Sequence, residues 1–195
     1  MELFGSRRAE MWHHLSALIG GKYVDAAQYQ SERINAEVGP WVVTLDSVEG
    51  IDTLYTRLRA PFRNIAGLRF SISKIETVDG RVTNLGGHDI TVGDPFFDET
   101  FLVQGNNDGL IVELLNDPEV RKLLEYQPSV HFEVRDNEGS FGPRFPEGSD
   151  ELYFIALEPI NDIEHLKGTF DLFAEVLHQL TVIGATSQEA AGVTI

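Results

Sequence analysis

The feature that most constrains this fold is an apolar stripe in the last quarter of the chain. Between residues 163 and 183, large apolar side chains recur at spacings of three and four, the period of one helix face. Asn161 and Glu164 form a capping-box pattern at its start, and Gly184 follows its end. The stripe predicts a long amphipathic C-terminal helix, which must cover an apolar surface elsewhere in the fold.

That surface is expected to be a sheet, because the preceding sequence alternates apolar and polar residues with the period of a strand. Turn signals at 48–52, 61–67 and 79–80 separate the segments by intervals too short for crossover helices, which favours antiparallel pairing. The candidate strands are residues 41–46, 55–60, 68–73, 88–92, 100–104, 130–135 and 151–157.

Three further helices are also expected. Residues 1–21 form an N-terminal helix that ends at two glycines, and residues 108–115 and 118–126 form a pair. Asp117 is a typical N-cap, and Pro118 fits the first helical position because it needs no N–H donor there.

These elements indicate one domain over residues 1–195. It has a β-rich half at 33–104, an α/β half at 105–184 that includes the C-terminal helix, and a frayed tail at 185–195. The predicted fold class is α+β, a mostly antiparallel sheet of six to eight strands packed by the long C-terminal helix. A capped, pleckstrin-like β-barrel is the alternative.

Composition limits the classes of partner. The chain has 15 Lys and Arg against 31 Asp and Glu, a net charge of −16, which disfavours nucleic-acid binding. It has no cysteine, no apolar run long enough to span a membrane and no signal-peptide pattern at its start. We therefore expect a soluble, acidic, cytoplasmic protein without membrane contact.

The basic residues are unevenly distributed. Residues 55–75 hold five basic residues and no acid, whereas residues 82–120 hold eight acids and no Lys or Arg. The basic residues are Arg57, Arg59, Arg63, Arg69 and Lys74. On a strand, Arg57 and Arg59 share the outer face while Leu58 points inward. The arginines either pair across the sheet with carboxylates of the acidic segment or bind an anion, an acidic partner or a neighbouring subunit.

The loop at 137–150 is rich in Gly and Pro around two aromatic residues, Phe141 and Phe145. A flexible spacer needs no such rings. Either they fold back over the core, or they form the rim of a binding site for a partner or a small molecule.

Catalytic motifs are absent from the sequence. No nucleophile motif, phosphate-binding loop or dinucleotide fingerprint is present, and no cofactor is predicted. His88, Asp94 and Asp98 are the candidate metal ligands, because carboxylates and an imidazole this close in sequence could face one cation. Turn and capping roles explain the same carboxylates.

Several runs resemble a family of soluble bacterial proteins of unknown function. They are YTRLRAPF at 55–62, HDITVGD at 88–94, FDETFLVQGN at 97–106, FGPRFPEGSDELYF at 141–154 and DLFAEVLHQL at 171–180. The resemblance spans about residues 41–184. It implies membership of that family but carries over no catalytic or binding residue.

The sequence thus favours a non-enzymatic binding or protein-interaction module, whose partner is another protein or a second copy of the chain. The alternative is a metal-assisted hydrolase that uses His88, Asp94 and Asp98.

Overall fold

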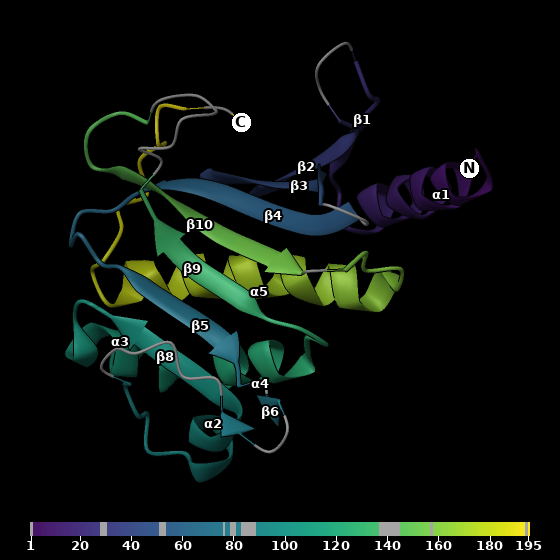
Figure 1. The fold of residues 1–195 in the computed structure, drawn as a ribbon. Coiled ribbons are helices and arrows are strands. Elements are labelled where there is room, and N and C mark those ends of the chain that lie inside the picture. The colour runs from purple at the N-terminus through teal and green to yellow at the C-terminus, as the bar shows by residue number, and fades with distance from the viewer. Residues whose placement is uncertain are drawn as a thin grey trace.

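A computed structural model describes residues 2–27, 31–50, 54–75, 77–78, 81–82, 89–136, 145–156, 158–193 and 195 (Figure 1). The helices are α1 (Glu2–Leu18), α2 (Pro95–Thr100), α3 (Asp108–Leu115), α4 (Pro118–Tyr126) and α5 (Ile163–Val182). The strands are β1 (Lys22–Val24), β2 (Arg33–Val38), β3 (Trp41–Glu49), β4 (Leu54–Arg63), β5 (Phe70–Lys74), β6 (Thr77–Val78), β7 (Arg81–Val82), β8 (Phe101–Gly105), β9 (His131–Arg135) and β10 (Ser149–Ala156).

Eight of the strands form one antiparallel sheet in the order β1-β2-β3-β4-β10-β9-β5-β8, and β6 pairs with β7 separately. The predicted α+β class is therefore confirmed. The barrel alternative is wrong, because β1 and β8 lie at opposite ends of the strand order and the sheet stays open. The last strand in sequence, β10, lies in the middle, between β4 and β9.

Helix α5 covers the centre of one sheet face, crossing behind β10 and β9 in Figure 1. Its apolar stripe is buried as predicted, and Phe173 packs edge-on against Phe132 of β9 with ring centroids 5.5 Å apart. The N-cap is Asp162 rather than Asn161, since the Asp162 carboxylate accepts from the His165 N–H at 2.9 Å. Gly184 ends the helix with a φ of +72°.

The other helices extend the same layer. Helices α1, α3 and α4 all contact α5, and Trp12 and Leu15 of α1 are buried in the core. Helix α4 begins as predicted, with Asp117 accepting from two backbone N–H groups and Pro118 at the first helical position.

Around α2, the structure differs from the sequence predictions in two features. Residues 89–92 are irregular rather than a strand, although the Ile90 N–H donates to Val103 of β8. The short helix α2 was not predicted. It begins where the Asp94 carboxylate accepts from the N–H groups of Phe96 and Phe97, which favours a helical turn after the proline.

The residues after α5 return to the sheet. The Ala185 carbonyl accepts from Ile65 and Ala66, and the Thr186 hydroxyl donates to the Arg63 carbonyl at 2.6 Å. Farther along, the Ser149 hydroxyl of β10 donates to the Ala191 carbonyl at 2.9 Å. The segment therefore contacts β4 and β10 at two separate points, where the sequence pattern indicates only fraying.

We predict that Phe173→Ala lowers the free energy of unfolding by ~3 to 5 kcal/mol, because the ring is fully buried between α5 and the sheet. Urea denaturation followed by circular dichroism measures this loss. Val182→Ala on the same helix is the control, because Val182 is 64% exposed and its loss should stay within about 0.5 kcal/mol. A loss below about 1 kcal/mol for Phe173→Ala would contradict the docking of α5.

Candidate functional site

The sheet face opposite α5, here called the open face, carries a cluster of charged side chains on its central strands. Register places Asp46 of β3 opposite Arg57 of β4, and Arg59 opposite Tyr153 of β10. Glu151, two residues before Tyr153, lies opposite Arg135 of β9. Directly opposed residues point to the same face of a sheet, so these side chains gather on one surface. Leu58, between the two arginines, is fully buried on the other face, as strand alternation predicts.

Two arginines share one carboxylate in this cluster. Arg57 binds Asp46 through two atoms, Nε to Oδ1 at 2.8 Å and Nη2 to Oδ2 at 2.7 Å. Arg59 adds a third bond from Nη2 to Oδ2 at 2.9 Å. Burial alone would lower the pKa of Arg57, but the hydrogen bond and charge of Asp46 raise it. The ion pair of Arg57 with Asp46 is thus held charged and in a fixed orientation.

Glu151 is the most deeply buried acid of the cluster, with a side chain only 1% exposed. Its Oε1 accepts from Arg135, from Nε at 3.3 Å and from Nη2 at 3.2 Å. Burial raises the pKa of Glu151, and the nearby charges of Arg59 and Arg135 only partly offset this effect. The Arg135 guanidinium also stacks over Tyr153, with its carbon 3.2 Å from the ring centroid.

Several buried polar atoms on the open face have no hydrogen-bond partner, and they belong to residues that lie next to one another across neighbouring strands. Asn35 Oδ1, Thr44 Oγ1 and Arg59 Nε are buried and have no hydrogen-bond partner, and register places these three residues side by side on β2, β3 and β4. Glu151 Oε2, on the next row, is also unpartnered. Buried polar groups are nearly always hydrogen-bonded, so four such atoms on adjacent strands are an unusual feature of this surface.

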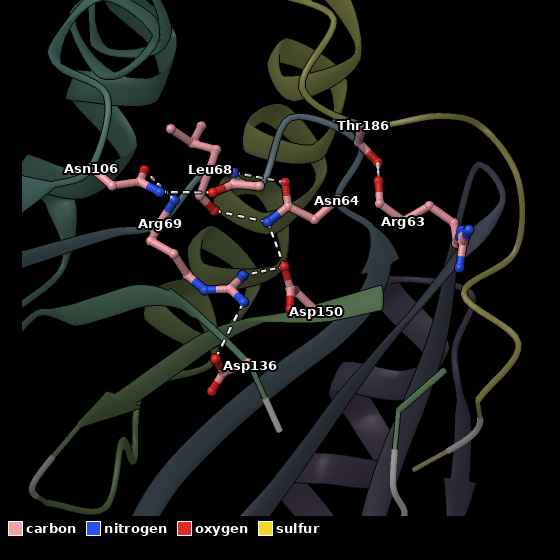
Figure 2. A network of polar contacts seen from close by, with 9 residues as sticks. Arg63, Asn64, Leu68, Arg69, Asn106, Asp136, Asp150 and Thr186 are labelled. Carbon is pink, nitrogen blue, oxygen red and sulfur yellow. Dashed lines mark hydrogen bonds and ion pairs between the residues drawn. The ribbon is translucent and has the colours of Figure 1, made fainter. Parts of the chain in front are cut away.

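The structure separates the other two predicted arginines from this cluster. Arg63 donates from Nη1 to the Glu147 carbonyl at 2.7 Å and to the Ser149 hydroxyl at 3.2 Å. Arg69 binds Asp150, and reaches Asp136 at 3.4 Å. Figure 2 shows Arg69 between these carboxylates, while the Arg63 side chain points away from them.

Arg69 belongs to a network that holds the turn after β4. Asn64 donates to the Leu68 carbonyl at 2.8 Å and also binds Asp150, while Asn106 accepts from the Arg69 N–H at 2.8 Å (Figure 2). The printed bonds of Arg63, Asn64 and Arg69 all go to acceptors of the same chain that hold this turn and the start of β10. We therefore assign Arg63 and Arg69 to the support of the fold.

The carboxylates that pair with Arg57, Arg59 and Arg69 do not come from residues 82–120, and Arg63 has no carboxylate partner among the described residues. Asp46, Asp136 and Asp150 bind the three paired arginines directly, from β3, from the end of β9 and from β10. The acidic segment is used differently, because Asp94, Asp98 and Asp117 accept hydrogen bonds from backbone N–H groups. The arginines of the basic segment at 55–75 therefore do not form ion pairs across the sheet with acids of the segment at 82–120.

The candidate metal ligands Asp94 and Asp98 serve as local caps. Asp94 caps α2, and its other oxygen lies 3.8 Å from Arg121. Asp98 accepts from the N–H groups of Val92 and Gly93, at 2.8 and 3.0 Å. His88 lies outside the described residues. Among those that the structure describes, no three His, Cys, Asp or Glu side chains are grouped to hold a metal ion.

The aromatic loop is described only in part. Phe141 lies outside the described residues, and Phe145, the first residue of the described stretch that leads into β10, is half-buried. Both interpretations of this loop therefore stay predictions.

Comparison of the chain with models of protein families, with curated proteins and with solved structures finds no match. The family resemblance of the sequence runs therefore stays a prediction. In the part of the chain that the structure describes, no helix is both long and apolar enough to cross a membrane.

Glu151 provides a pH-dependent prediction. The pKa of Glu151 is raised in the folded protein, so this side chain ionises at a lower pH in the unfolded chain. Between the unfolded and the folded pKa, the free energy of unfolding of wild type therefore falls as the pH rises. Glu151→Gln cannot ionise. We expect the melting temperatures of wild type and Glu151→Gln to differ least below about pH 4, where residue 151 is neutral in both proteins. Toward pH 7 the melting temperature of the variant should rise relative to that of wild type. Melting temperatures from pH 3.5 to 8 measure the trend; a relative loss for the variant at pH 7 would instead show that the Arg135 pair stabilises the fold.

Proposed function

We propose that the protein is a non-enzymatic binding module that holds an acidic group of a partner on its open face, through Arg57 and Arg59. The observation that supports this function best is that these two guanidinium groups share the single carboxylate of Asp46. Each guanidinium carries five N–H donors, and Asp46 receives only three bonds from the pair. A second carboxylate or a phosphate fits the remaining donors in the same planar geometry.

The charge of the open face supports the same choice of partner. Strand register aligns more basic than acidic side chains there, among the residues that the structure describes. The basic ones are Lys22, Arg33, Arg57, Arg59, Arg63 and Arg135, and the acidic ones are Glu37, Asp46, Glu133 and Glu151. The whole chain has a net charge of −16, so this positive surplus is local. An acidic partner is attracted here and repelled by the rest of the surface.

Preorganisation favours binding over catalysis. The side chains of Arg57 and Arg59 are 22% and 15% exposed, so each is largely packed in place yet still reaches solvent. A ligand that meets donors already held in position loses less conformational entropy on binding. The metal-assisted hydrolase gains no such support, since Asp94 and Asp98 already accept backbone hydrogen bonds. Bacterial origin and a cytoplasmic location remain predictions.

Arg59→Lys tests this proposal, because it keeps the charge and removes the planar donor geometry. The probe is a short fluorescein-labelled peptide rich in Glu and Asp, titrated by fluorescence anisotropy across a salt series. We expect wild type to bind with salt-sensitive affinity and Arg59→Lys to weaken binding about tenfold, as the loss of a charge-assisted bond does.

Arg121→Lys is the matched control, since Arg121 donates to the Leu115 carbonyl away from the open face. Arg121→Lys changes neither the net charge of the chain nor the charged cluster on the open face. This variant should therefore bind the peptide as wild type does. Equal binding by the two lysine variants, or no binding by wild type at low salt, would refute the proposed function.

A further inference from the structure

A second surface lies on the helical side of the molecule, where α4 and α5 pack together. Between them runs an open groove of about 540 Å³, within the size range of ligand sites. Leu123 and Tyr126 of α4 and Gly168 of α5 supply its uncharged part, and Glu125 and Glu164 are among the acids that line it. None of these residues belongs to the open face, so this groove is separate from the site proposed above.

The groove contains an aromatic ring held close to a helix backbone. A Cβ atom added at Gly168 would lie 3.0 Å and 3.1 Å from two ring carbons of Tyr126, so a larger residue would push the ring outward by a few tenths of an ångström. Glycine inside a helix costs about 1 kcal/mol relative to alanine, and this contact accounts for its presence in α5. The Tyr126 ring also packs beside His165, with centroids 4.8 Å apart. Tyr126 nevertheless stays 48% exposed, which leaves part of it available to a partner.

The charges of the groove are unbalanced. Its two lysines are already paired, Lys122 with Glu119 at 2.9 Å and Lys167 with Asp171 at 2.6 Å. Glu125 and Glu164 make neither a hydrogen bond nor an ion pair with any residue that the structure describes. Both acids interact by charge with lysines, Glu125 with Lys74 and Glu164 with Lys167, but neither is bound in an ion pair, and the acids that line the groove outnumber its lysines.

We propose that the α4/α5 groove is a docking site for a basic segment of another protein and binds one of its Lys or Arg side chains. An aromatic ring attracts a cation through its electron-rich face, and carboxylates supply the opposite charge. Leu123 and the body of Tyr126 offer apolar contact to the alkyl part of such a side chain. The partner is thus opposite in charge to the one proposed for the open face.

Charge specificity is the first test, because a chain of net charge −16 attracts any cationic peptide. The probe is a short fluorescein-labelled peptide that alternates Arg and Leu, titrated by anisotropy at several salt concentrations. Glu125→Gln/Glu164→Gln is compared with Glu10→Gln/Glu113→Gln, which makes the same charge change at two exposed acids outside the groove. We expect about a tenfold loss of affinity for the groove variant and less than a twofold loss for the control. Equal losses, or no loss in the groove variant, would overturn the proposal.

The second test addresses the ring. Tyr126→Leu keeps an apolar side chain and removes the cation–π contact, and we expect it to weaken peptide binding about three- to tenfold. Melting temperature checks that the variant stays folded. Amide chemical-shift changes in wild type should centre on Leu123 and Gly168; shifts centred elsewhere would overturn the proposal even if a variant fails to fold. Arg59→Lys should leave this binding unchanged, so failure here is distinct from failure of the open-face site.

Discussion

The packing of α5 against the centre of the sheet is the contact on which the rest of the structure depends. Strand β10 joins β4 to β9, so the two halves of the sheet meet at the strand that directly precedes α5. Phe154 of β10 and Phe173 of α5 are both fully buried in the same core. Because apolar burial is concentrated on this face, the opposite face of the same strands is left to carry charge.

The open face contains acidic side chains that are buried, which is energetically unfavourable for a charged group. Asp46 and Glu151 are buried acids that depend on arginines of neighbouring strands for their hydrogen bonds. Both oxygens of Asp46 accept hydrogen bonds from guanidinium groups, whereas burial outweighs the arginine charges at Glu151 and raises its pKa. A cluster selected for stability alone would not keep a buried acid with one oxygen unpartnered. The binding function proposed for this surface uses the arginines of this same cluster.

Patterns within single segments of the sequence predicted the helices and the faces of the strands. The contacts of the candidate site depend instead on which strands pair and in which register. The stripe of α5, the Asp117 cap and the shared face of Arg57 and Arg59 follow from spacings within one segment, which the sequence displays directly. The partnership of Arg57 with Asp46 depends on β3 pairing with β4 in one particular register, and that of Glu151 with Arg135 depends on β10 entering the middle of the sheet. Neither pairing leaves a signal in a single sequence. Tyr126 and Gly168 were missed for the same reason, since each is unremarkable until the two helices pack.

The two proposed sites call for partners of opposite charge, and Arg57 and Arg59 are poorly placed to supply the cation that the groove of a second copy would bind. The groove needs a cationic side chain that projects far enough to enter it. Arg57 and Arg59 are bound to Asp46 and mostly packed into the sheet surface, so they cannot extend into the groove of a second copy without breaking those bonds. The two proposed sites lie on opposite faces of the sheet, so the proposals together imply that one chain could bind an acidic and a basic partner at once.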